Sequence, residues 1–180
     1  MSSDASRAWS HLLALPASSG LVVSEGAGAM QRRLLREGCY EATGAFRHVL
    51  SLPGPQALAW TEDPADGSVL AYALLRAFST TFYAYVPDRI GAAPLGIVGA
   101  WVRPERRRRG HGTTVLAQLG TACAGLRPDG FVVFAEDRMV SHAQSCLPFL
   151  VLPRWANQQP NEQEVRRAVR WRGHLAQMAH

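Results

Sequence analysis

The sequence contains no lysine, and this absence excludes one class of chemistry at once. All 19 of its Lys and Arg residues are arginine, so a Schiff base or a lysine general base cannot operate. Guanidinium groups instead bind phosphate and carboxylate in planar, bidentate contacts. Together with a net charge of +5, they favour an anionic partner: a phosphate-bearing cofactor, a nucleic acid or an acidic substrate. A coding bias toward arginine codons is the alternative explanation.

Cysteine is scarce as well. The three cysteines, Cys39, Cys123 and Cys146, are odd in number and widely spaced. We therefore expect no disulfide framework and a reducing, cytoplasmic location. No Cys-x-x-Cys occurs, and the six histidines form no metal-spaced pair, so no metal site is expected.

Long apolar runs are also missing. No stretch approaches the roughly 20 residues of a membrane helix, so no membrane partner is expected. The first residues lack a positive segment followed by an apolar one, so we expect no secretory signal. The chain has 180 residues, of which 47% are hydrophobic and 18% charged. This composition predicts one globular domain over residues 1–180.

Hydrophobic periodicity and turn residues predict helices interleaved with strands. The expected helices are 4–14, 28–38, 40–50, 111–125, 139–147 and 161–178. The expected strands are 20–24, 56–61, 68–76, 81–86, 95–102, 131–135 and 149–152. The strands 56–61 and 68–76 flank a turn cluster and are typical of a hairpin. This order predicts a mixed α/β (α+β) single domain.

One segment combines the features of an anion site. The strand 95–102 is followed by Pro104, an arginine-rich loop and Gly110-His111-Gly112, where a helix begins. The first amides of a helix lack intrahelical acceptors, and the helix dipole is positive there. Glycines let a phosphate approach the backbone closely. The segment therefore predicts a phosphate or diphosphate site.

This segment resembles motif A of the GNAT acyltransferases, which use acyl-coenzyme A. Val102-Arg103-Pro104 matches the Val-x-Pro that ends the family's fourth strand. The run from Arg107 to Gly112 matches the (Arg/Gln)-x-x-Gly-x-(Gly/Ala) that opens its third helix. The resemblance covers about residues 95–135. It implies a single GNAT-like domain, with a central, mostly antiparallel sheet and helices on both faces, and acetyl-coenzyme A or another acyl-coenzyme A as cofactor.

The resemblance also implies roles for individual residues. A diphosphate would lie against the backbone of the loop and first helical turn, which comprise Arg107, Arg108, Arg109, Gly110, His111, Gly112 and Thr113. A bulge near Ala100, Trp101 and Val102 would lie beside the pantetheine arm, where a backbone N–H would polarise the thioester carbonyl. The acceptor pocket would lie between the helices at 28–50 and the loop after the fifth strand, lined by Tyr40, Glu41, Arg47 and Trp101.

Two catalytic features of the family are missing. The tyrosine that protonates the departing thiolate would stand at Leu147, and no tyrosine follows Tyr85. Cys146 is the candidate general acid in its place, with a small buried core thiol as the alternative reading. The strand 95–102 also lacks the glutamate that many members use as general base. Glu136 and Asp137, or water alone, are the candidate proton acceptors, with exposed turn carboxylates as the alternative.

The C-terminal segment departs from the family as well. Members commonly finish with a strand hairpin, whereas an arginine-rich helix is expected here over 161–178. Its arginines are compatible with nucleic-acid phosphates, with a solvated face, or with a contact between two copies of the chain. Three functions follow: acyl transfer by direct attack of a primary amine, on a small molecule or a macromolecule; acyl transfer to an amine carried by DNA or RNA; and a non-catalytic binding module.

Overall fold

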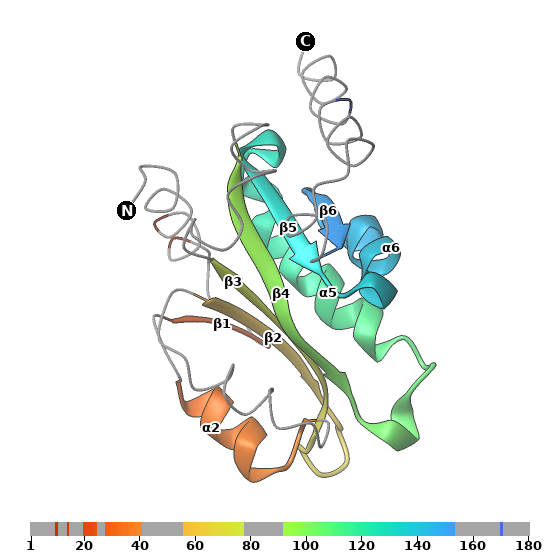
Figure 1. Cartoon of the computed structure of the whole chain (residues 1–180). Coiled ribbons are helices and arrows are strands. Elements are labelled where there is room, and N and C mark those ends of the chain that lie inside the picture. Colours follow the sequence, from red (N-terminus) through yellow and green to blue (C-terminus); the bar gives the residue numbers. More distant parts are fainter. Residues whose placement is uncertain are drawn as a thin grey trace.

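A single sheet organises the structure. The computed structural model describes residues 20–24, 28–40, 56–77 and 92–153, together with Ser10, Ala14 and Arg170. The strands follow one another across the sheet in sequence order (Figure 1): β1 Leu21–Ser24, β2 Gln56–Glu62, β3 Val69–Ala77, β4 Ala93–Val102, β5 Phe131–Ala135 and β6 Leu150–Pro153. The strands β1 to β4 pair antiparallel, and β5 and β6 then pair parallel. This confirms the predicted mixed α/β class.

Helices cover both faces of this sheet (Figure 1). The helix α2, Ala29–Arg36, packs on one face through Leu34. The helices α5, His111–Ala122, and α6, Asp137–Cys146, pack on the other face. Short 3-10 turns at Pro104–Arg106, Cys123–Gly125 and Pro128–Gly130 connect these elements. Among the described residues, no helix is long and apolar enough to cross a membrane.

The sequence-predicted elements in the described ranges are present, with ends shifted by at most about three residues. The hairpin of β2 and β3 and the strand 131–135 are confirmed. The predicted elements 4–14, 40–50, 81–86 and 161–178 lie outside the described residues, apart from a few single positions. The candidate acceptor residues Glu41 and Arg47 lie outside them too.

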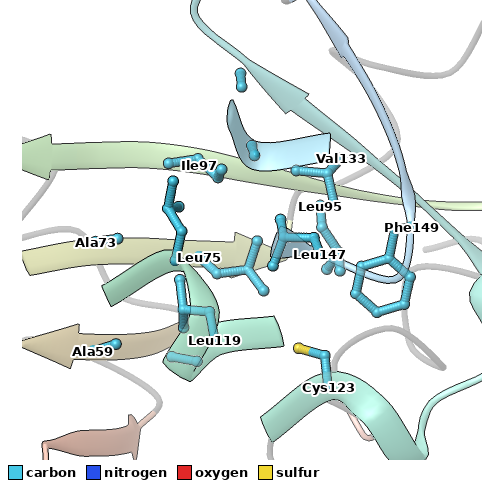
Figure 2. Packing of buried hydrophobic residues seen from close by; sticks show 14 of the residues in the cluster. Ala59, Ala73, Leu75, Leu95, Ile97, Leu119, Cys123, Val133, Leu147 and Phe149 are labelled. Atoms are coloured by element: carbon cyan, nitrogen blue, oxygen red, sulfur yellow. The ribbon is translucent and has the colours of Figure 1, made fainter. Parts of the chain in front are cut away.

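Small side chains on the sheet let α5 approach closely. Four buried alanines of β2 and β3 face α5, whose buried stripe is Val115, Leu116 and Leu119: Ala57, Ala59, Ala71 and Ala73. Figure 2 shows Leu119 and Cys123 pointing at Leu75 and Leu147 in this cluster. The buried β5, which the sequence presents as a continuous apolar run, packs in the same core. This core holds α5 against the sheet and so fixes where its N-terminus lies.

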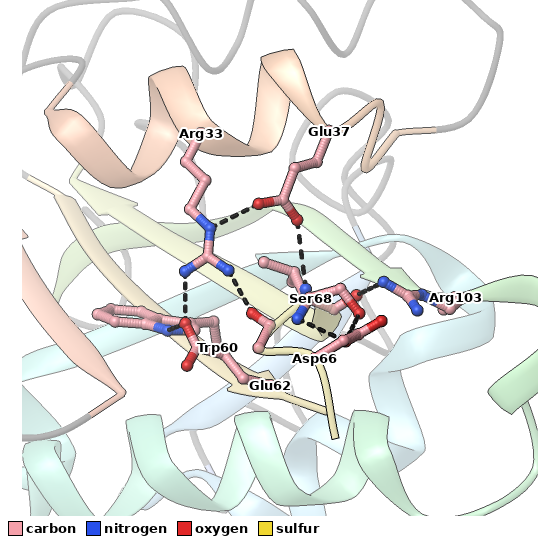
Figure 3. Close-up of polar contacts among 9 residues, drawn as sticks. Arg33, Glu37, Trp60, Glu62, Asp66, Ser68 and Arg103 are labelled. Carbon is pink, nitrogen blue, oxygen red and sulfur yellow. Dashed lines mark hydrogen bonds and ion pairs between the residues drawn. The ribbon is translucent and has the colours of Figure 1, made fainter. Parts of the chain in front are cut away.

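A polar network attaches α2 to the turn between β2 and β3 (Figure 3). Arg33 contacts Glu37, Glu62 and the carbonyl of Gly67. Burial raises the pKa of Glu37, but hydrogen bonds from Arg33 and from the Val69 amide outweigh it, so the net pKa lies below its ordinary value. The network therefore fixes α2 on its face of the sheet.

Candidate functional site

The strands β4 and β5 separate partway along β4. Their pairing runs from Ala93 opposite Phe131 to Gly96 opposite Phe134, and β4 then continues to Val102 with no further strand pairing on this side among the described residues. Figure 1 shows β4 extending past the end of β5. Because backbone groups of a strand point alternately to its two sides, part of the β4 backbone beyond Gly96 faces the gap.

The strand β4 also carries the expected bulge, but the prediction of its position is wrong by about two residues. Leu75 pairs with Ile97 and Leu74 with Gly99, so Val98 is the extra residue. Trp101 pairs regularly with Tyr72. Glycines at Gly96 and Gly99 flank the bulge, and glycine within a strand commonly marks one. The extra residue thus falls where β4 parts from β5.

The turn between β4 and α5 presents free backbone donors. Arg108 has a φ of 62° and Gly110 a φ of 85°, both left-handed. The Thr114 amide makes the first bond of the helix, to the Gly110 carbonyl. Within the described part of the chain, the backbone N–H groups from Arg108 to Thr113 have no protein acceptor. Consecutive N–H groups around a left-handed residue form an anion-binding concavity.

The arginines of this turn fall into two groups. Arg103 donates to the Val69 carbonyl, and Arg106 pairs with Asp63 at 3.1 Å, so both support the β2–β3 turn. Arg107 donates weakly to the Val102 carbonyl at 3.3 Å. Arg108 and Arg109 are exposed. The basic run is therefore partly structural and partly available to an anion.

The free amides border a pocket of about 410 Å³. Trp101 and Tyr72 line it from the face of the sheet that carries α2, whereas Ala100, Val102 and Leu116 line it from the face that carries α5. The pocket therefore runs through the gap beside β4. It brings together most of the residues predicted to bind a cofactor: Ala100, Trp101, Val102, Arg107, Arg108, Gly110, His111, Gly112 and Thr113.

The charge of the pocket has one sign. Its lining includes three arginines and two histidines and, among the described residues, no carboxylate: Arg107, Arg108, Arg138, His111 and His142. A cavity with basic walls attracts anions. Such a lining is compatible with a ligand that carries phosphate groups.

His142 is a site residue that the sequence analysis missed. It lines the pocket from α6, and its Nε2 lies 2.8 Å from Oγ1 of Thr113. No spacing rule connects the two residues, because they are 29 positions apart and meet only through the packing of α5 against α6. The only local signal is the resemblance, which places a functional helix after the fifth strand.

The predicted catalytic residues do not line this pocket. Glu136 is exposed at the start of α6 and pairs with Arg138 at 3.0 Å. Cys146 is half-buried at the end of α6, where its side chain packs on the core around α5. Leu147, at the family's tyrosine position, is 4% exposed. Of the two described acceptor candidates, Trp101 lines the pocket, whereas Tyr40 follows α2, is half-buried and does not line it.

Burial keeps the phenol of Tyr72 and the thiols of Cys39 and Cys123 neutral. Burial, with a smaller contribution from Cys39, raises the pKa of Tyr72 well above its ordinary range. The Tyr72 ring stacks on Trp101 with ring centroids 6.3 Å apart. Burial also raises the pKa of Cys39 to about 11 and that of Cys123 to about 12. These two thiols are core residues and not nucleophiles.

No family model matches the chain, and no curated protein shows a significant match to it. Among the described residues, no cluster of His, Cys, Asp and Glu is suited to a metal ion. The function is therefore argued from the pocket itself.

Proposed function

We propose that this chain is a GNAT-type N-acyltransferase, which transfers an acyl group, acetyl in the simplest case, from acyl-coenzyme A to a primary amine. One observation carries the proposal. Among the described residues the amides from Arg108 to Thr113 have no acceptor, and all of these residues except Arg109 line a basic pocket beside β4, where its pairing with β5 has ended. A diphosphate satisfies several such amides at once. An unrelated basic loop would not require the adjoining gap in the sheet.

The residues present fit the coenzyme. The turn supplies amides and the guanidinium groups of Arg107 and Arg108 for the diphosphate. Gly112 has no Cβ, so the backbone is open to a phosphate, and Val102 is the nearest side chain at that point. The backbone of β4 that faces the gap is suited to the pantetheine amides, in the manner of an added strand. The acyl-coenzyme A supplies the activated thioester.

The residues of this chain then act mainly by positioning. Holding a thioester and an amine together converts a bimolecular step into a unimolecular one. In this proposal a backbone N–H of β4 near the bulge at Val98 would donate to the thioester carbonyl as negative charge develops on it. No carboxylate lines the described pocket, so water accepts the proton of the amine in this scheme.

Titration calorimetry with acetyl-coenzyme A tests the binding half of the proposal, and thiol release with a panel of primary amines tests the catalytic half. We expect binding and an amine-dependent release of free thiol. Acetylpantetheine, which lacks the phosphates, is the matched control ligand and is expected to bind much more weakly. Absence of binding by acetyl-coenzyme A rejects the proposal.

A non-catalytic coenzyme-binding module is the second candidate. Leu147 is buried where the family places its tyrosine, and neither Glu136 nor Cys146 lines the pocket. Binding of acetyl-coenzyme A without thiol release from any amine would support this second function. Amine-dependent release rejects it.

A further inference from the structure

Thr113 and His142 connect the two helices that border the pocket. Thr113 lies in the first turn of α5 and His142 in α6, and Oγ1 of Thr113 lies 2.8 Å from Nε2 of His142. Both residues line the pocket and both are exposed. The Thr113 amide is also one of the free donors at the start of α5. An anion held by those amides therefore lies next to this hydrogen bond.

The direction of this hydrogen bond depends on the protonation of His142. In a neutral imidazole with its proton on Nδ1, Nε2 accepts and the Thr113 hydroxyl donates to it. In an imidazolium both ring nitrogens donate, so Nε2 donates to Oγ1 and the hydroxyl proton is released toward the pocket. Protonation thus adds a charge and frees a donor. In the other neutral tautomer, protonation changes the charge alone.

Among the described residues, the side chains that line the pocket with His142 are basic or neutral. Arg138, one turn earlier in α6, lines the same pocket and pairs with Glu136 outside the lining. The opposite wall contributes Arg107, Arg108 and His111, and β4 contributes the neutral Trp101. A bound dianion beside His142 would favour its protonated form. Proton uptake and anion binding are therefore coupled.

We propose that His142 is a coenzyme-positioning residue that takes up a proton when the diphosphate of a coenzyme A binds, and that together with Thr113 it makes this affinity depend on pH. The inference rests on the proposed function, because it requires a diphosphate at the start of α5. Affinity is then higher at pH 6 than at pH 8, since histidine side chains change charge in this interval.

The experiment is titration calorimetry with dephospho-coenzyme A at pH 6 and pH 8, in two buffers of different ionisation enthalpy. This ligand keeps the diphosphate and lacks the 3′-phosphate, whose own titration near pH 6 would add a second pH dependence. We expect the native chain to bind about five- to tenfold more tightly at pH 6 and to take up a fraction of a proton near pH 7.

Three variants separate His142 from its neighbours. His142→Gln is expected to lose most of the pH dependence and most of the proton uptake. His111→Gln changes the other histidine of the lining, and loss of the pH dependence in this variant alone would assign the coupling to His111 and overturn the role of His142. Thr113→Val removes the hydroxyl and keeps the shape of the side chain. It is expected to reduce the pH dependence, and combining it with His142→Gln should reduce it no further.

The outcomes distinguish this inference from the proposed function. Equal pH dependence in the native chain and in His142→Gln overturns the role of His142 and leaves the coenzyme site standing. Failure of the native chain to bind at either pH overturns both. Thermal unfolding checks that each variant folds, and if His142→Gln does not, an unchanged pH dependence in Thr113→Val overturns the inference.

Discussion

At the scale of single residues, a substitution of Gly112 should change the affinity for the ligand without lowering the free energy of unfolding. A Cβ built on Gly112 would meet Val102 Cγ2 at 3.4 Å, an ordinary contact, and Gly112 lies in a helix without a left-handed φ. The fold therefore tolerates alanine here, which stabilises a helix by up to about 1 kcal/mol relative to glycine. The added methyl group nevertheless occupies the wall beside the free amides.

For Gly112→Ala we expect coenzyme A to bind at least about tenfold more weakly, with a free energy of unfolding that is unchanged or slightly higher. Calorimetry and urea unfolding measure the two quantities. Gly125→Ala is the matched control, because a Cβ there meets nothing within 4 Å and lies away from the pocket. Native affinity in Gly112→Ala would contradict a diphosphate at this turn.

The left-handed residues of the same turn carry a related argument. A non-glycine residue with a positive φ costs about 1–3 kcal/mol and persists where the surroundings hold it, commonly at ligand clamps. Arg108 has this conformation, whereas the neighbouring left-handed position is the glycine Gly110. Glycine would adopt the backbone conformation of Arg108 at a lower cost. The presence of arginine there is consistent with a role for its positive charge at the pocket.

At the scale of elements, α5 and α6 approach each other closely at Gly120. A Cβ built on Gly120 would lie 2.0 Å from the backbone oxygen of Cys146. Because backbone cannot move aside as a side chain does, Gly120→Ala forces α6 away from α5. We expect a loss of about 2 kcal/mol or more in the free energy of unfolding, after the gain in helix propensity.

Urea unfolding of Gly120→Ala measures this loss, and Gly112→Ala on the same helix is the control for propensity alone. The separation of α5 and α6 would also lengthen the contact between Thr113 and His142. A variant as stable as the native chain would mean that the two helices are not packed this closely.

The network of Arg33 is a second prediction at this scale. Arg33→Met keeps the aliphatic stem and removes the contacts to Glu37, Glu62 and Gly67. We expect it to lose about 1–2 kcal/mol at pH 7, as for a small network of partly exposed pairs with one bond to a carbonyl. Arg109→Met, an exposed residue, is the charge-matched control.

The effect of Arg33→Met should also depend on pH. The net pKa of Glu37 is lowered in the fold, because hydrogen bonds from Arg33 and the Val69 amide outweigh the opposite effect of burial. A carboxylate with a lowered pKa stabilises the fold above its unfolded pKa, and this contribution is lost as the pH falls through the folded one. Urea unfolding at pH 7 and again below about pH 4 measures this. The difference in free energy of unfolding between the native chain and Arg33→Met should be smaller at the lower pH. A constant difference would contradict this role for Glu37.

Elements were more predictable from the sequence than their contacts. The strand at Phe131 was predictable to the residue, because a short apolar run lies between a Pro-Asp-Gly turn and two acidic residues. The turn before α5 was predictable from its proline and glycines. The bulge at Val98 was misplaced, because its position depends on the register between β3 and β4 and not on β4 alone. Gln31 is fully buried on α2, although its type predicts exposure.

At the scale of the whole molecule, the site depends on segments that meet only in the folded sheet. Tyr72 comes from β3, Trp101 from β4, Thr113 from α5 and His142 from α6, and the pocket forms because β4 continues where β5 ends. A local sequence motif indicates one wall of this pocket, which is formed by the turn between β4 and α5. No local motif indicates the opposite wall, because Arg138 and His142 are positioned by the packing of α6 against β5, β6 and α5.

A ligand that binds only the assembled pocket must stabilise the whole fold. Acetyl-coenzyme A at 100 times its dissociation constant adds about 2.7 kcal/mol to the free energy of unfolding. In a domain of this size, that corresponds to a rise of about 5–10 °C in the melting temperature. Because the lining is basic and open to solvent, raising NaCl from about 0.1 to 0.5 M should reduce the rise substantially. Differential scanning calorimetry measures it, with acetylpantetheine as the control ligand. Two results would mean that the free amides of α5 and the arginines beside them do not hold the phosphates. One is an equal rise in melting temperature with acetylpantetheine, and the other is a rise with acetyl-coenzyme A that does not change with salt.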